Sequence, residues 1–150
     1  MESDFQSRSS REGRTAQEIA YSVVQGAGFR VVERNWRSKE LGLTINLLAE
    51  DQSGVRWCFD VSGAFRSSRG GLLRTDTVWK TLGRAVVLVN RHIHPVVFLT
   101  TNLPKPNSGG FKALHSAGPS TFFDALELTP PGDRSRLRRY ACGGAHERPL

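Results

Sequence analysis

Apolar residues recur at helical spacing between positions 16 and 27, and this periodicity predicts the first helix of the fold. Thr15 followed by Glu18 has the spacing of a capping box, in which each side chain bonds the backbone of the other residue. We therefore expect the helix to begin just after Gly13 and to end at Gly28. Its buried face is expected to hold Ala16, Ile19, Ala20, Val23, Val24 and Ala27.

Two later stretches alternate strictly between apolar and polar residues, after a short predicted strand at 29–33 and a polar loop at 35–42. Residues 50–54, Glu-Asp-Gln-Ser-Gly, are rich in turn formers and suit a hairpin connection between the two stretches. The pattern predicts a β-hairpin with one apolar and one polar face. The apolar face is expected to hold Leu43, Ile45 and Leu47 from the first strand, and Val55, Trp57, Phe59 and Val61 from the second.

The polar face of this hairpin is where chemistry is most to be expected. If both apolar faces are buried together, cross-strand partners must have residue numbers with an even sum, because a one-residue slip would turn one strand over. A sum near 106 places Asn46 opposite Asp60 and Thr44 opposite Ser62.

The next part of the chain predicts a helix followed directly by a strand. After a loop rich in Gly, Ser and Arg at 63–74, Thr75 or Asp76 can cap a helix. That helix carries Val78, Leu82 and Ala85 on one face. Residues 85–89 form a continuous apolar run, which favours a strand buried on both faces.

Residues 96–99 form a second such run and predict another buried strand. We expect a short helix at 111–117, a strand at 122–128 and a last helix capped near Asp133. The last helix is expected to face inward with Leu137, Tyr140 and Ala141.

Length and composition favour one domain, because 150 residues of which 38% are hydrophobic are enough for a single core. Residues 1–13 are polar and are expected to be a disordered lead-in, residues 14–143 the domain, and residues 144–150 a loose tail. No apolar run approaches the ~20 residues that span a bilayer, and no secretory stretch is evident, so a cytoplasmic location is expected.

The net charge of +7 is concentrated in two regions. Residues 56–91 hold seven Arg or Lys against Asp60 and Asp76, and a second arginine group lies at 134–139. Clustered arginines favour a polyanionic partner such as DNA, because each neutralised phosphate releases counterions, although a solvated basic surface is the alternative. The residues expected to contact nucleic acid are Arg66, Arg69, Arg74, Arg84 and Arg138.

Other chemistry has weaker support in the sequence. Cys58 and Cys142 lie in no Cys-x-x-Cys pair, and Cys58 is better interpreted as an inert thiol than as a nucleophile. His92 and His94 alternate in a short segment, but two histidines without a third ligand are more often surface residues. The Gly-rich segments lack the Gly-Lys-Ser/Thr pattern of a phosphate loop, which disfavours nucleotide hydrolysis.

The predicted order of a helix, three strands, a helix and further strands is the αβββαβ order of the PD-(D/E)xK nuclease superfamily. The segment GRTAQEIAYSVVQGAGFRVVERNWR resembles the first helix and strand of its Holliday-junction-resolvase-like branch, and LTINLLAEDQSGVRWCFDVS resembles the catalytic hairpin. The resemblance covers residues 13–65, with architectural agreement to residue 100. It implies a restriction-endonuclease-like α/β fold, with a mixed central sheet flanked by helices.

The resemblance also implies a catalytic constellation for Mg²⁺, in which three ligands hold the metal against the phosphate and a Lys assists the attacking water. Carried over, the ligands are Glu18, Asn46 and Asp60, and the Lys position is Ser62. Only Glu18 and Asp60 retain the acidic chemistry. Lys80 of the following helix, or Arg66, could supply the missing cation. The simpler interpretations are that Glu18 only closes a capping box and that Asp60 is a solvent-facing strand residue.

Three functions therefore stay open. The protein is a weak Mg²⁺-dependent DNA endonuclease with an atypical active site, a cleavage-deficient DNA-binding relative, or a protein-interaction subunit or homodimer that uses the nuclease fold as a scaffold. If the first holds, replacing Asn46 by Asp and Ser62 by Lys together is expected to increase cleavage.

Overall fold

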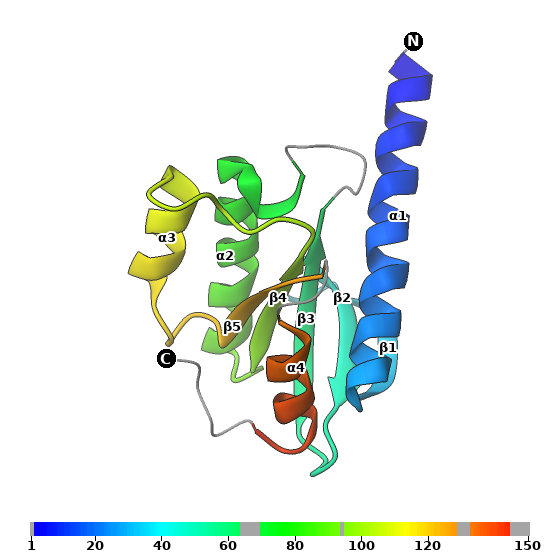
Figure 1. Cartoon of the computed structure of the whole chain (residues 1–150), viewed down its shortest axis with the longest axis vertical. Coiled ribbons are helices and arrows are strands. Elements are labelled where there is room, and N and C mark those ends of the chain that lie inside the picture. Colours follow the sequence, from blue (N-terminus) through cyan, green and yellow to red (C-terminus); the bar gives the residue numbers. More distant parts are fainter. Residues whose placement is uncertain (1, 64–69, 94, 129–132, 145–150) are drawn as a thin grey trace.

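The computed structural model describes residues 2–63, 70–93, 95–128 and 133–144, with side chains from Thr15 onward. Its fold is α/β, and the predicted αβββαβ order is confirmed (Figure 1). The elements are α1 (Glu2–Ala27), β1 (Arg30–Ser38), β2 (Leu43–Glu50), β3 (Arg56–Ser62), a 3-10 turn (Gly71–Leu73), α2 (Thr75–Asn90), β4 (Val96–Thr100), α3 (Gly109–Ala117), β5 (Asp124–Glu127) and α4 (Arg134–Ala141).

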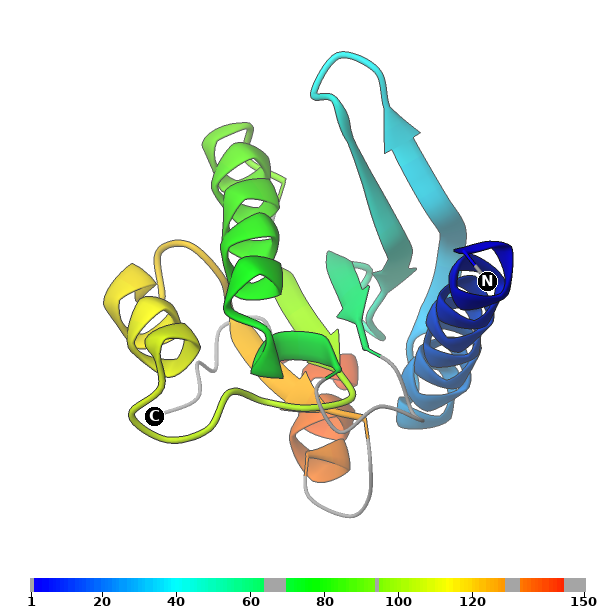
Figure 2. The same cartoon turned by 90° about the horizontal axis from the view of Figure 1, so that it is seen from above.

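The strands form one mixed sheet in the order β1-β2-β3-β4-β5. The pairs β1–β2 and β2–β3 are antiparallel, whereas β3–β4 and β4–β5 are parallel. A parallel pair needs a crossover connection, which α2 supplies between β3 and β4. Helices α1 and α4 pack on one face of the sheet, and α2 and α3 on the other (Figure 2).

Strand β3 divides the core into two clusters because successive side chains point to opposite faces of a sheet. Trp57 and Phe59 pack with residues of α1 and α4, and Phe29 contacts both rings edge-on. Cys58 packs on the other face with residues of α2. Asp60 follows on this second face, where it is almost fully buried.

The start of α1 differs from the expectation. The helix begins at Glu2, so the expected lead-in of residues 1–13 is helical from Glu2 onward. Thr15 and Glu18 consequently lie inside the helix and form no capping box. Residues 2–13 contain no proline, and extending an existing helix avoids the cost of nucleation. The predicted buried face is confirmed at Ala16, Ala20 and Val24, with Ile19, Val23 and Ala27 half-buried.

The predicted strand at 85–89 is wrong, because α2 continues without a break to Asn90. Ala85 and Leu88 extend the buried stripe at helical spacing, whereas Val86 and Val87 are exposed. A short apolar run does not by itself distinguish a buried strand from the end of a helix. The predicted strand at 96–99, the helix at 111–117 and the inward residues of the last helix are confirmed.

The predicted loop at 35–42 is shorter than expected, because β1 extends to Ser38. Asn35 lies between the pairs Arg34–Leu47 and Trp36–Ile45, and its φ of 53° interrupts the regular pleat. Beyond this point the outer hairpin packs toward α2. In β2, Leu43 and Ile45 join the α2 cluster while Leu47 joins the α1 cluster, so the prediction that the three share one face is wrong.

Candidate nucleic-acid interface

A buried ion pair joins the middle of the sheet to α2 at the position where the sequence predicts a metal ligand. Asp60 is 3% exposed. Arg84 donates from Nε to one Asp60 oxygen at 2.7 Å and from Nη2 to the other at 3.2 Å. Nη2 of Arg84 also donates to Thr81 Oγ1 at 3.3 Å. Both carboxylate oxygens are thus bound by one guanidinium in the fork geometry that suits this pair.

Two opposing effects set the pKa of Asp60. Burial raises the pKa because it penalises the charged carboxylate, and the hydrogen bonds and charge of Arg84 offset part of that rise. The Arg84 side chain is itself about one-third exposed, at 31%. Asp60 is therefore a partnered interior residue and not the solvent-facing strand residue that the simpler interpretation supposes.

The register of the β2–β3 ladder has the predicted sum, whereas the predicted pairs Asn46–Asp60 and Thr44–Ser62 lie beyond the end of the ladder. The β2–β3 ladder pairs Leu47 with Phe59 and Glu50 with Arg56, so its residue numbers sum to the predicted 106. The described ladder ends at Leu47–Phe59, and the next residue, Asn46, pairs through its side chain. Asn46 Oδ1 accepts a hydrogen bond from the Val61 N–H at 2.7 Å. The Asn46 side-chain oxygen, which was expected to face a metal, is therefore bonded to the backbone of the residue that follows Asp60.

Ser62, at the position where the Lys is expected, pairs with β4, the strand on the other side of β3 from β2. It pairs with Thr100 of β4, and its Oγ donates to Thr100 Oγ1 at 3.3 Å. Thr100 Oγ1 in turn accepts from the Leu72 N–H and donates to the Asn102 carbonyl. Ser62 is thus part of a network that ties β3 and β4 to the turn before α2.

The remaining residues of the predicted catalytic set do not complete a metal centre. Glu18 is exposed on α1 and lines a pocket of about 450 Å³ with Arg134 and Arg138 of α4. Lys80 is exposed on α2, one turn before Arg84. Within the described residues, no three His, Cys, Asp or Glu side chains are close enough to hold a metal ion. With both Asp60 oxygens held by Arg84, this arrangement does not fit Mg²⁺.

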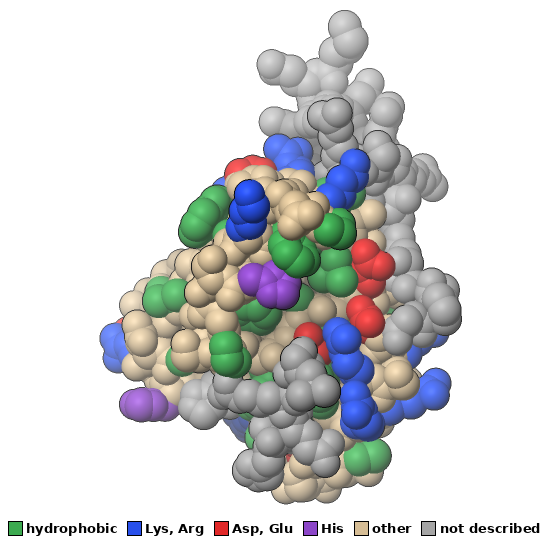
Figure 3. Space-filling model, turned by 60° about the vertical axis from the view of Figure 1, so that its left-hand side comes forward, with side chains coloured by type: hydrophobic (Ala, Val, Ile, Leu, Met, Phe, Trp, Pro, Cys, Tyr) green, Lys and Arg blue, Asp and Glu red, His purple; other side chains and the backbone are tan. Residues whose placement is uncertain are grey.

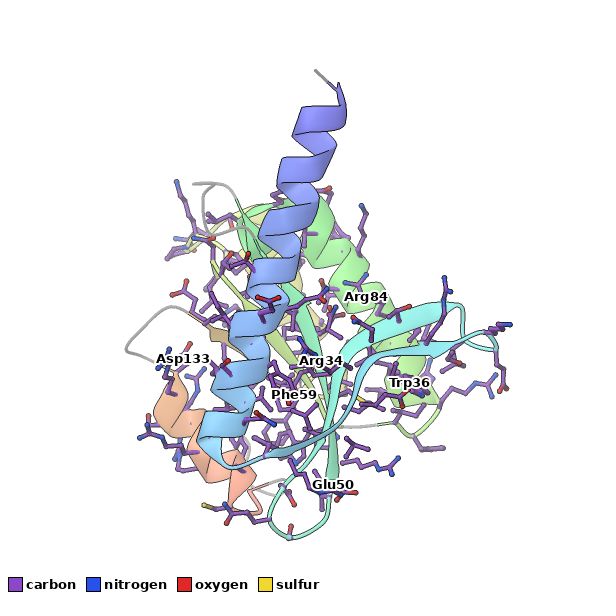
Figure 4. The ribbon with its side chains drawn as sticks, turned by 90° about the vertical axis from the view of Figure 1, so that its right-hand side faces the viewer. Arg34, Trp36, Glu50, Phe59, Arg84 and Asp133 are labelled. Atoms are coloured by element: carbon purple, nitrogen blue, oxygen red, sulfur yellow. The ribbon has the colours of Figure 1, made fainter. Side chains whose placement is uncertain are left out.

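An open groove lies beside the ion pair, between the tip of the β1–β2 hairpin and α2. Its volume is about 600 Å³, and it is lined by Arg37, Ser38, Lys39, Gly42, Leu43, Thr44 and Arg84. Three of these residues are basic and none is acidic. Figure 4 shows Arg84 at the level where the hairpin passes α2. Sequence reasoning missed Arg37 and Lys39 because they fall in a predicted loop outside the basic region 56–91.

The other predicted contact residues are dispersed. Arg66 and Arg69 lie outside the described residues. Arg74 is exposed and pairs with Asp76 at 3.4 Å. Arg138 is exposed on α4, which packs on the opposite face of the sheet from α2. Figure 3 shows a face on which Lys and Arg side chains gather beside a few acidic ones. Within the described residues, this groove brings together basic residues of two elements, Arg37 and Lys39 of the hairpin and Arg84 of α2.

The structure gives no catalytic role to the described cysteine and histidine candidates, Cys58 and His92. Cys58 is buried, and burial followed by the charge of Asp60 raises its pKa to about 12, so its thiol is not activated. His92 is exposed with a φ of 59°, and His94 lies outside the described residues.

Comparison with known proteins gives one structural likeness. No family model matches the chain, and no curated protein matches it. A solved EndoMS-dsDNA2 complex is similar to it with a TM-score of 0.44 and 14% sequence identity. The alignment covers 69% of this chain and 38% of the other, so this chain spans well under half of that protein's length. None of the described helices is long and apolar enough to cross a membrane.

Proposed function

We propose that the protein binds DNA and does not cleave it by the metal-dependent route of the PD-(D/E)xK nucleases that its sequence resembles. The observation that carries this proposal is the bidentate contact of Arg84 with Asp60, which occupies the one strand carboxylate of the expected catalytic set. A Mg²⁺ ion needs free oxygen ligands, and the adjacent guanidinium charge would oppose a second cation. Asn46 and Ser62 are also engaged in internal hydrogen bonds.

The case for DNA rests on charge and its placement. The chain carries a net charge of +7, and Arg37, Lys39 and Arg84 line one groove without an acidic neighbour in its lining. A hollow with basic walls attracts polyanions from a distance and holds phosphates at close range. This basic surface does not depend on a bound metal, since its residues are not those that would hold one.

A protein-interaction role has one observation in its favour. Trp79, Val86 and Val87 are exposed along α2, with Trp79 61% exposed. Such apolar side chains often mark contact surfaces for other proteins. Binding to such a partner would depend weakly on salt, whereas phosphate contacts make affinity fall steeply with salt. Salt dependence therefore distinguishes the two candidates.

The test combines a binding and a cleavage assay on the natural protein. Anisotropy of a labelled duplex measured between about 50 and about 200 mM salt should show at least a roughly tenfold loss of affinity, with the same values in Mg²⁺ and in chelator. Supercoiled and branched DNA incubated with Mg²⁺ or Mn²⁺ should stay unnicked. Absence of salt-sensitive binding would refute the DNA proposal. Metal-dependent nicking that is lost in Asp60→Asn would show instead that Asp60 is an active metal ligand.

A further inference from the structure

We infer that the groove between the hairpin tip and α2 binds the DNA phosphate backbone, with Arg37 and Lys39 contacting phosphates from one wall and Arg84 from the other. Lys80, one turn before Arg84, extends this basic surface beyond the groove. This inference rests on the proposed function and names the surface that performs it. The sequence predicted one of these contacts, Arg84, together with loop and α4 arginines, but it did not predict that Arg84 and the hairpin residues line one groove.

The helix wall carries a basic stripe at regular spacing. Lys80 and Arg84 lie one turn apart on one flank of α2, and Arg91, seven residues further on, is the C-cap residue of the helix. Arg84 lines the groove, and Arg91 Nη1 lies 3.5 Å from Glu40 Oε1 at the hairpin tip. The flank of α2 that carries these residues therefore faces the hairpin.

The hairpin wall is held in place by apolar packing. Trp36, Leu41 and Leu43 of the outer hairpin pack against the same buried cluster as Val89 and Ile93, which lie near the end of α2. The exposed Arg91–Glu40 pair adds little by itself, since surface ion pairs contribute little to stability. Because both elements pack on this one cluster, the two walls of the groove are in place before a ligand binds.

Asp60 has a positioning role in this groove. Its carboxylate and Thr81 Oγ1 hold the Arg84 guanidinium from the buried side, and the exposed part of Arg84 borders the groove. A guanidinium held in one orientation loses less side-chain entropy when it binds a phosphate. Asp60 thus orients Arg84 for a phosphate contact. In the nucleases that the sequence resembles, the acid at this position would bind a metal.

The test compares two charge-matched double variants. Arg37→Gln with Lys39→Gln removes two positive charges from the hairpin wall. Lys105→Gln with Lys112→Gln removes the same charge from the loop before α3 and from α3, where both side chains are exposed. Helix α3 packs beside α2 on the side away from the hairpin (Figure 2). Any effect of net charge alone is the same in the two variants.

The groove variant should lose at least about tenfold in affinity for the labelled duplex, and the slope of log affinity against log salt should fall by about 2. The control variant should lose less than about threefold at moderate salt and keep its slope. Circular dichroism and thermal melting show whether both variants fold. If the groove variant does not fold, Thr44→Asp, on the same wall and exposed, should weaken binding in its place.

Equal losses in the two variants, with both slopes unchanged, would overturn the groove as the binding surface while the protein remained a DNA binder. No salt-sensitive binding by the natural protein would overturn the proposed function itself. The two failures are therefore distinguishable in one set of titrations.

Discussion

Asn46 Oδ1 accepts the Val61 N–H at 2.7 Å, and this side chain continues the pairing of β2 with β3 after the backbone ladder has ended. An aspartate at the same position could accept the same hydrogen bond, because its carboxylate offers oxygens in the same place. An acid at this position is therefore compatible with the hydrogen bond, and Arg84 is the contact that keeps the Asp60 oxygens from a metal.

The contact of Arg84 with Asp60 changes the outcome expected when the missing acid and lysine are restored at positions 46 and 62. Asn46→Asp with Ser62→Lys should stay inactive in a nicking assay as long as Arg84 occupies Asp60. Adding Arg84→Ala frees the Asp60 oxygens, and the triple variant should nick DNA with Mg²⁺ or Mn²⁺ but not with chelator. Adding Asp60→Ala to the triple variant should abolish that activity. Nicking by the double variant would show that Arg84 is not the barrier.

Arg84→Met should destabilise the fold by about 3 kcal/mol, because it leaves the buried Asp60 carboxylate without a partner. Arg74→Met is the matched control, since Arg74 pairs with Asp76 on the surface, and its effect should be much smaller. Urea denaturation measures both. Asp60→Asn combined with Arg84→Met should recover most of the loss, and failure to recover it would mean that Arg84 acts through packing.

The stability of Arg84→Met relative to the natural protein is predicted to depend on pH. Burial raises the pKa of Asp60 above its unfolded value, and loss of Arg84 removes an interaction that lowers it. A carboxyl whose pKa is higher in the folded state costs stability above the unfolded pKa and ceases to do so as the pH falls below it. The stability gap between Arg84→Met and the natural protein should therefore narrow on acidification. A gap that widens at low pH would contradict this assignment.

Asp51 is predicted to be a stabilising residue of the β2–β3 turn. It accepts hydrogen bonds from the Ser53 and Val55 N–H groups, from Ser53 Oγ and from Trp57 Nε1. Burial alone would raise its pKa, but these donors outweigh burial and lower it. Asp51→Asn should cost about 1–3 kcal/mol near neutral pH, because an amide nitrogen in place of the second oxygen leaves the Trp57 N–H unpaired.

For a carboxyl with a lowered folded pKa, the stabilisation is present above the unfolded pKa and is lost as the pH falls through the folded value. The difference between Asp51→Asn and the natural protein should thus shrink in acid, as measured by urea denaturation at several pH values. Glu33→Gln, at an exposed position of β1, serves as the control and should leave the denaturation midpoint nearly unchanged.

The two cysteines should differ in reactivity. Cys58 is buried with a pKa raised to about 12, whereas Cys142 is exposed. Iodoacetamide at mildly alkaline pH should modify Cys142 in the native protein and both residues after unfolding, because only an accessible thiolate reacts. Mass spectrometry of the peptides locates the modification. Native labelling of Cys58 would contradict its assignment as an inert interior thiol.

Much of the fold could be predicted from the local pattern of apolar and polar residues. The α1 face with Ala16, Ala20 and Val24, the register sum of 106 and the inward residues of α4 all follow from periodicities of helix and strand that tertiary contacts do not alter. The pattern failed at 85–89, where a short apolar run fits a helix as well as a strand, and in β2, where Ile45 and Leu47 pack on different faces although they are two residues apart.

The sequence by itself determined which residue types are present and which strand positions they occupy, including an acid at Asp60 and no acid at Asn46. Only the tertiary structure decided what these residues do. Arg84 lies 24 residues beyond Asp60 in the chain, and the two meet because the crossover between parallel strands lays α2 over β3. The groove likewise forms because the outer hairpin and α2 pack on the same buried cluster, although they are distant in the chain. Contacts between elements depend on how whole faces pack, and local periodicity carries no information about that geometry.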